Sequence, residues 1–266
     1  MSHLQTILDH IPAAMLVVFR LGGLMIFGPV FGSAMVPVRV KVFLAFIIGL
    51  AIYPLLSAET FVGGPVSLSL WLLGPIVAME LMVGLIIGYV ASLPMMAVQT
   101  GGLIMGQQMG LGFAQFYNPA IDDEADIVGQ LLFFMALAGF LLIGGHEFMV
   151  LAVLHSFSHV PLGGFSPDAS LLALIGGLLL AAFELAMRVA APLLALIFLQ
   201  SIAMGFISKT VPQLNILSLG FPLRILAGFL IVAVGLIVIN EVVMEGIDAT
   251  LAAIFGWIES YGDRAI

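Results

Sequence analysis

Six long apolar stretches set what this chain can fold into. They cover residues 11–36, 42–57, 66–98, 127–154, 169–207 and 216–243. A bilayer core about 30 Å thick is crossed by a helix of about 20 apolar residues. Only 8% of the 266 residues are charged, whereas a soluble domain carries roughly 25%. The sequence therefore predicts an all-α integral membrane protein of about six long, partly kinked apolar helices that pack as hairpins.

The connections between these stretches are short, so no soluble domain fits among them. We therefore expect one membrane domain over residues 1–266. The fifth stretch is much longer than one crossing needs, and it contains Pro192. Because proline removes a helix hydrogen bond, this stretch is predicted to be either one kinked helix or two half-helices packed as a hairpin.

Charge and cysteine content exclude several classes of protein. The net charge is −8 and the chain has no basic run, which argues against nucleic-acid binding and polybasic lipid anchoring. The chain has no cysteine, so disulfides and thiolate catalysis are excluded. The first ten residues contain no Lys or Arg, so the N-terminus is not expected to be a signal peptide.

The segment 101–126 is the most unusual part of the sequence, and its residues fit two interpretations. Gly102, Gly106 and Gly110 recur at every fourth position, among methionine and aromatic residues. One interpretation is a pore loop, because such a segment combines the backbone freedom and deformable side chains that sealing a pore requires. The alternative is an ordinary connection that follows a glycine-packed helix end. The candidate gate residues are Gly106, Met109, Gly110, Leu111, Gly112, Phe113, Phe116 and Tyr117.

Five charged residues lie within or at the edge of the apolar stretches, where each costs about 2.5–3.5 kcal/mol at a helix centre. Glu184 and Arg188 are four residues apart and can pair on one helix face, which favours a role in assembly over proton transfer. Glu80 has no local partner, so we expect an intersubunit contact or, as an alternative, a pair with Arg20. The remaining charge in these stretches is Arg224.

Gly84 and Gly88 lie four residues apart in the third apolar stretch. Small residues at this spacing allow two helix backbones to approach closely. We therefore expect these two glycines to mark a close helix–helix contact.

The sequence gives no support for an enzyme, a metal site or a cofactor. His146-Glu147 begins like a zinc-protease helix, but Val150 occupies the position where the second histidine is required. His155 and His159 have no third ligand at a suitable spacing. The competing hypothesis is an ion-coupled secondary transporter of a small solute, with Glu80 and the Glu184–Arg188 pair in a midplane site.

The ordered combination of several short motifs resembles the FliR/SctT family of export-gate subunits, found in flagellar and virulence type III secretion systems. The resemblance spans nearly the whole chain. The motifs are Arg20-Leu21-Gly22-Gly23 with Gly28-Pro29-Val30-Phe31-Gly32, Val36-Pro37-Val38-Arg39-Val40, Glu80 with Gly84 to Gly88, Gly106-Gln107-Gln108-Met109-Gly110, His155-Ser156-Phe157 with Pro161, Val211-Pro212-Gln213-Leu214-Asn215 and Gly220-Phe221-Pro222-Leu223-Arg224.

This resemblance implies a structural subunit of a protein-export gate in the bacterial inner membrane and flagellar basal body. The expected partners are FliP-like, FliQ-like and FlhB-like membrane proteins, the lipid bilayer and unfolded export substrates in transit. The family also places an inward loop in the closed pore, and that loop maps here to about Gly106–Asp122. The positive-inside rule places Arg39, Lys41 and Lys209 in the cytoplasm, with both chain termini outside.

Overall fold

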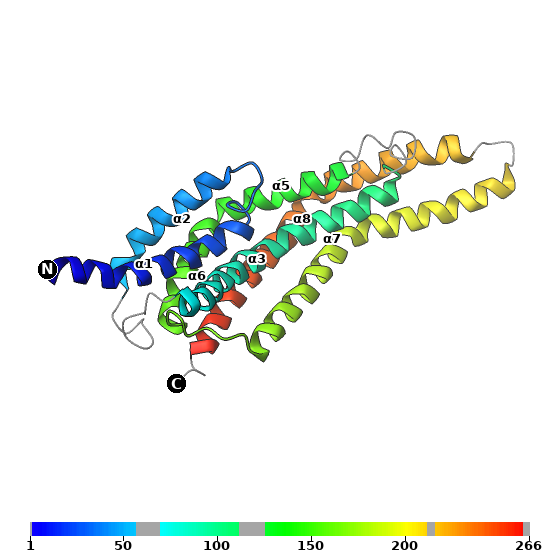
Figure 1. The fold of residues 1–266 in the computed structure, drawn as a ribbon. Coiled ribbons are helices and arrows are strands. Elements are labelled where there is room, and N and C mark those ends of the chain that lie inside the picture. The colour runs from blue at the N-terminus through cyan, green and yellow to red at the C-terminus, as the bar shows by residue number, and fades with distance from the viewer. Residues whose placement is uncertain (1, 57–69, 112–125, 212–215, 263–266) are drawn as a thin grey trace. The chain divides into compact units, whose positions relative to one another are not determined.

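The computed structural model describes residues 2–56, 70–111, 126–211 and 216–262, and no strand occurs among them. Among the described residues, five helices are long and apolar enough to cross a membrane, or six if α5 and α6 count as one span. The predicted all-α class with about six long apolar helices is thereby confirmed. The elements are α1 (Ser2–Phe27), α2 (Val38–Ile52), the 3₁₀ turn η1 (Tyr53–Leu55), α3 (Leu70–Met109), α5 (Ile127–Leu142), α6 (Gly145–His159), α7 (Ala169–Thr210) and α8 (Ile216–Gly262) (Figure 1).

The first connection lies earlier in the chain than the apolar pattern indicates. Helix α1 ends at Phe27, although the apolar stretch continues to residue 36. A residue that precedes proline avoids the helical conformation, and Gly28 precedes Pro29. Helix α2 then begins directly after Pro37, so Arg39 belongs to its first turn.

The predicted stretch 127–154 is not one helix. Helices α5 and α6 are separated at Gly144, which has a φ of 76°. This left-handed conformation is accessible to glycine and strained for most other residues. The break therefore has a local cause that hydropathy does not reveal.

Three helices are longer than predicted. Helices α3, α7 and α8 contain 40, 42 and 47 residues. Helix α7 continues through Pro192, so the alternative of two half-helices is wrong. Helix α8 continues past residue 243 to Gly262, through Glu245 and Asp248. Acidic residues lower the hydropathy of a segment, but they do not end a helix.

The chain divides into two compact units. Unit 1 comprises residues 1–93, 141–178 and 248–266, and unit 2 comprises residues 94–140 and 179–247. Helices α3, α7 and α8 each contribute residues to both units. The membrane domain expected from the sequence thus contains two units that are built in part from the same helices.

In unit 1, α1 buries one apolar side against α3 and α6. Val17, Leu21 and Leu24 of α1 are fully buried and recur at a spacing of three to four residues, which is the period of one helix face. Val83 of α3 and Val153 of α6 are also fully buried. Removing such an apolar side chain from water contributes about 1.5–3 kcal/mol.

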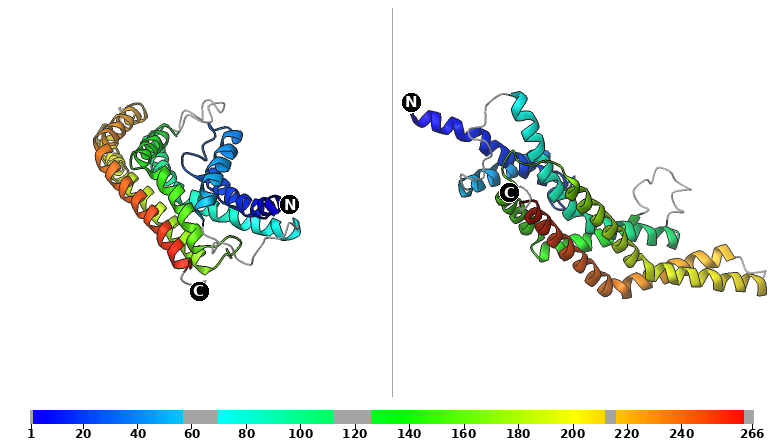
Figure 2. Two further views of the ribbon diagram at one scale, coloured as in Figure 1. Left: turned by 90° about the vertical axis from the view of Figure 1, so that its left-hand side faces the viewer. Right: turned by 90° about the horizontal axis from the view of Figure 1, so that it is seen from below.

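In unit 2, residues 179–210 of α7 and 216–247 of α8 run antiparallel to each other, as the right view of Figure 2 shows. A Cβ atom at Gly246 would lie 2.9 Å from a methyl of Leu185, and one at Gly220 would lie 3.5 Å from the Met204 methyl. These two contacts define which residues of α7 and α8 lie opposite each other.

Candidate functional site

The charged centre of unit 1 is the ion pair between Arg20 of α1 and Glu80 of α3. Arg20 Nε donates to Glu80 Oε2 at 2.6 Å, and both side chains are 0% exposed. The other guanidinium nitrogens donate to Ser156 Oγ at 2.9 Å and to the Val160 carbonyl at 3.0 Å. The arginine also lies over the Phe157 ring, 4.3 Å from its centroid. A buried charge is tolerated only when it is paired and hydrogen-bonded, and Arg20 meets both conditions.

Both carboxylate oxygens of Glu80 have hydrogen-bond partners within the chain. Its second oxygen, Oε1, accepts the backbone N–H of Gly163 at 2.8 Å. Gly163 has a φ of 77°, which glycine adopts without strain. The expectation that Glu80 contacts another subunit is therefore corrected: it connects α1, α3 and the loop after α6. Arg20 is 136 residues from Ser156, and sequence reasoning missed Ser156 and Gly163 because no local pattern links such distant positions.

Glycines allow α1 and α3 to approach closely beside this ion pair. A Cβ atom at Gly84 would overlap the Arg20 carbonyl oxygen, and one at Gly88 would lie 2.9 Å from the Gly28 nitrogen. From the other helix, a Cβ atom at Gly23 would lie 2.7 Å from the Leu85 nitrogen. Gly84 and Gly88 thus both face α1. The sequence analysis did not single out Gly23 as their counterpart.

The other three candidate charged residues, Glu184, Arg188 and Arg224, belong to unit 2. Arg188 Nη2 donates to Glu184 Oε1 at 2.7 Å, and both side chains are about 60% exposed. On α8, Arg224 Nη2 donates to Ser201 Oγ of α7 at 3.1 Å. The sequence thus located the Glu184–Arg188 pair. It could not locate the Arg224–Ser201 hydrogen bond, because that contact depends on how α7 and α8 align as antiparallel helices.

Half of the candidate gate segment lies within the described residues. Helix α3 continues through Gly106 to Met109, and the turn that follows contains Gly110 with a φ of 88°. Met109 is fully buried, and its side chain lies against Gly228 of α8. Leu111 is half-buried. The other gate residues, Gly112, Phe113, Phe116 and Tyr117, lie outside the described residues.

The ends of the helices that flank this segment are in close contact. A Cβ atom at Gly102 of α3 would lie 2.5 Å from the Gly129 Cα atom of α5. Gln99 Nε2 donates to Asp126 Oδ2 at 3.1 Å. The residues just before and just after the gate segment are therefore fixed relative to each other.

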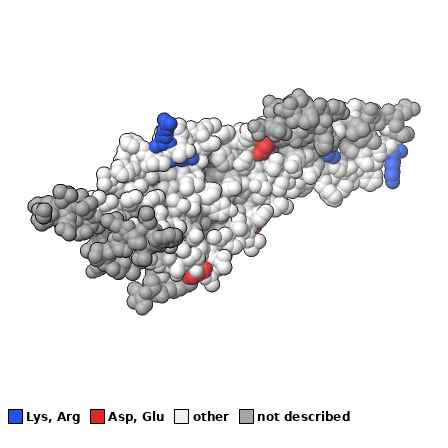
Figure 3. All heavy atoms as spheres, in the orientation of Figure 1, with Lys and Arg blue, Asp and Glu red and all other residues white. Residues whose placement is uncertain are grey.

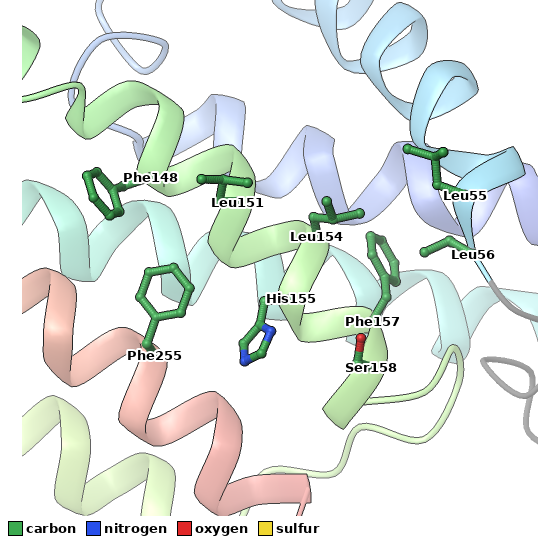
Figure 4. Close-up of a pocket in the computed structure, with 9 residues that line it drawn as sticks. All are labelled: Leu55, Leu56, Phe148, Leu151, Leu154, His155, Phe157, Ser158 and Phe255. Carbon is green, nitrogen blue, oxygen red and sulfur yellow. The ribbon is translucent and has the colours of Figure 1, made fainter.

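A pocket of about 520 Å³ opens in unit 1 beside α6 (Figure 4). Its lining is apolar except for His155 and Ser158. His155 Nε2 lies 3.6 Å from Glu259 Oε1, and its ring lies 4.5 Å from the ring of His159. No group of three or more metal-ligating side chains occurs in the part of the chain that the structure describes. The histidines instead pack α6 against the end of α8.

Comparison with known proteins identifies the family. Residues 11–250 match the family described as bacterial export proteins, family 1. This chain belongs to that family. The matched region of this bacterial export protein begins in α1 and ends in α8, so it includes the Arg20–Glu80 network, the glycine contact and the candidate gate segment.

Relatives within this family confirm the resemblance seen in the sequence. The chain is 29% identical over 252 residues to flagellar biosynthetic protein FliR of Bacillus subtilis strain 168, over 93% of this chain and 95% of that protein. It is 32% identical over 209 residues to flagellar biosynthetic protein FliR of Escherichia coli K12, over 77% of each chain. It is also 28% identical over 183 residues to Yop proteins translocation protein T of Yersinia pestis, over 66% of this chain and 67% of that protein.

Proposed function

We propose that this bacterial export protein is a structural subunit of a type III protein-export gate, helping to form and seal a channel for unfolded polypeptides. Support comes from its family and from relatives named for flagellar biosynthesis and for protein translocation. We place it in the inner membrane, at the flagellar basal body, because two relatives covered over 95% and 77% of their length are flagellar biosynthetic proteins.

The observation that carries this proposal is the length of the exposed apolar helices. Helices α7 and α8 contain 42 and 47 residues, which correspond to about 60–70 Å at 1.5 Å per residue. A bilayer core is only about 30 Å thick. Large apolar residues are exposed along α7 from Leu172 to Phe206, which is about 51 Å of helix, and along α8 from Leu219 to Val238, which is about 29 Å. Lipid alone is too thin to cover the exposed apolar length of α7.

Few charged side chains interrupt the apolar surface of the molecule (Figure 3). The exposed Glu184–Arg188 pair supplies two of them. It lies among Leu180, Phe183 and Met187, which are all more than half exposed. An exposed ion pair is costly in lipid, and the surrounding apolar patch is costly in water. A partner protein with both apolar and hydrogen-bonding groups covers the apolar patch and also forms hydrogen bonds with the ion pair. We assign this role to FliP-like, FliQ-like and FlhB-like membrane proteins.

We infer a structural rather than a catalytic role, without a cofactor. The two charges that are most deeply buried, on Arg20 and Glu80, are occupied by structural hydrogen bonds. The same occupancy disfavours the transporter hypothesis, since a coupling carboxylate has to exchange protons or ions with a water-filled path. Glu184 is accessible, but its partner Arg188 lies within hydrogen-bond distance.

We retain the segment from Gly106 to Tyr117 as the gate. Helix α3 ends at Met109, directly before Gly110 with its φ of 88°, and the flanking contacts Gly102–Gly129 and Gln99–Asp126 supply a fixed base. The backbone freedom that glycine gives an apolar segment suits a gate that seals a pore and yields to a passing chain. Met109 packs on Gly228 within this chain. We therefore assign the pore-facing role to Leu111, Phe113 and Phe116 in preference to Met109.

Co-purification from the membrane tests the assignment. An affinity-tagged copy of the chain, extracted in mild detergent, is expected to bring down small membrane proteins of different sequence in fixed ratio. Without them the chain is expected to aggregate, because its long apolar faces are uncovered. A stable, monodisperse single chain that binds a small solute would contradict the proposal and favour the transporter.

A further inference from the structure

An apolar groove of about 310 Å³ lies between α1 and α2 in unit 1. Met15 and Phe19 of α1 form one wall, and Phe46 and Leu50 of α2 form the other. The two helices are close near the middle of the groove, where a Cβ atom at Gly49 would lie 2.7 Å from Val18 Cγ2. The described lining contains only apolar residues.

The groove is open to its surroundings. Met15, Phe46 and Leu50 are 51%, 52% and 56% exposed. Because apolar surface is unfavourable in water by about 25 cal/mol per Å², an apolar occupant is favoured. At the far end, the hydrogen bond between His10 Nδ1 and the Tyr53 hydroxyl, 2.5 Å long, connects the two helices.

Two cations lie at the other end of the groove. Arg39 and Lys41 are in the first turn of α2, which contains no acidic residue. Among the described residues, neither forms an ion pair, whereas Arg20 and Arg188 both do. The preceding Pro37 provides no side-chain cap, so the first N–H groups of α2 add positive potential at the same place.

The spacing of these groups matches one half of a bilayer. Arg39 and Phe46 are seven residues apart and therefore share a helix face. Leu50 lies eleven residues beyond Arg39, which is about 16 Å along the helix. One leaflet of a hydrocarbon core is about 15 Å thick. A negative headgroup at Arg39 thus places its acyl chain over the whole groove.

We propose that this groove binds an acyl chain of an anionic phospholipid, with the phosphate held by Arg39 and its negative charge further favoured by Lys41 in the same helix turn. A lipid fits better than a partner helix because the charge is confined to one end and the rest of the groove is uncharged. An anionic headgroup fits better than a zwitterionic one because no acidic residue in the first turn of α2 balances the two cations. This proposal does not depend on the export function; it requires only that α2 lies in a membrane.

Photocrosslinking from the groove tests the proposal. The full chain, with its co-purifying membrane proteins, carries the substitution Phe46→p-benzoylphenylalanine and is placed in vesicles of equal parts phosphatidylglycerol and phosphatidylcholine. After irradiation, mass spectrometry of the chain identifies the adducts. Each basic residue near a membrane favours anionic lipid by about fivefold, so with two basic residues we expect phosphatidylglycerol adducts in excess on the order of 25-fold. The double variant Arg39→Gln, Lys41→Gln is expected to return the adducts to the vesicle ratio.

The matched control is Phe134→p-benzoylphenylalanine on α5. Phe134 is 54% exposed, and α5 and α6 contain no Lys or Arg. Lipid adducts from this position are expected to show no preference. Equal adducts of the two lipids from Phe46 would overturn headgroup recognition, and protein adducts there would assign the groove to a partner subunit. If the Phe46 variant is not recovered, Leu50→p-benzoylphenylalanine probes the same groove.

Discussion

Arg20 and Glu80 lie 60 residues apart in the sequence and form a fully buried ion pair, with 2.6 Å between Arg20 Nε and Glu80 Oε2. The same arginine contacts Ser156 and the Val160 carbonyl, and the same carboxylate accepts a hydrogen bond from Gly163. This network joins α1, α3, α6 and the loop after α6. Unit 1 therefore depends on contacts between residues that are far apart in the chain.

Removing one partner of this pair is expected to destabilise unit 1 strongly. Arg20→Met leaves a buried carboxylate without its cation, which costs about 3–5 kcal/mol. The double variant Arg20→Met, Glu80→Leu removes both charges and should regain part of that loss. The measurement is thermal unfolding and yield of the detergent-purified complex. Arg188→Met, at an exposed pair, is the control, and equal effects of the two single variants would contradict the buried role of Arg20.

The α1–α3 contact offers a test with matched glycines. Gly88→Leu and Gly84→Ala should each disrupt packing by about 1–3 kcal/mol or more, because added atoms meet backbone of α1. Gly74→Ala is the control on the same helix. No atom lies within 4 Å of the position that a Cβ at Gly74 would take, so this substitution should not disrupt packing. The adjacent glycines of α1 repeat the comparison, since Gly23 faces α3 and Gly22 faces open space. If Gly74→Ala and Gly84→Ala lowered the unfolding temperature equally, the close approach of α1 and α3 would not be the cause of the destabilisation.

Arg188 is expected to matter for assembly more than for folding. The Glu184–Arg188 pair is exposed, so its contribution to the free energy of unfolding is only about 0–1 kcal/mol. Arg188→Leu leaves Glu184 without its cation in an apolar surface, and should lower the recovery of partner subunits several-fold. The measurement is the ratio of partner to tagged chain after co-purification, with Arg188→Lys as the charge-preserving control. Normal recovery combined with lost proton-coupled solute uptake would support a transporter instead.

Apolar periodicity and local spacing made part of this structure predictable. The helical class follows from long apolar stretches, and the Glu184–Arg188 pair follows from its i,i+4 spacing. For Glu80 the sequence named Arg20 only as an alternative to another subunit, because Arg20 and Gly163 meet Glu80 only after three helices pack. Helix ends were also missed: Gly28-Pro29 ends α1 within an apolar stretch, and α8 continues through acidic residues where hydropathy falls.

The candidate site was predictable to a similar extent. Glycine spacing marked Gly84 and Gly88, which face α1, but gave no sign of Gly23 on the opposite helix. Glycine and methionine content marked the segment after Gly101, yet its first part is the end of α3, with Met109 packed on Gly228. A single sequence shows which residues are small or flexible, but not which surface each one faces.

We infer that this chain helps to form a channel that a short segment seals at rest. Deleting residues 110–116 removes the apolar gate and leaves the Gly102–Gly129 and Gln99–Asp126 contacts in place. Conductance to small ions, measured across a planar bilayer that contains the purified complex, should rise well above that of the unmodified complex, with subunit composition unchanged. An intact complex that carries the deletion and stays ion-tight would contradict the claim.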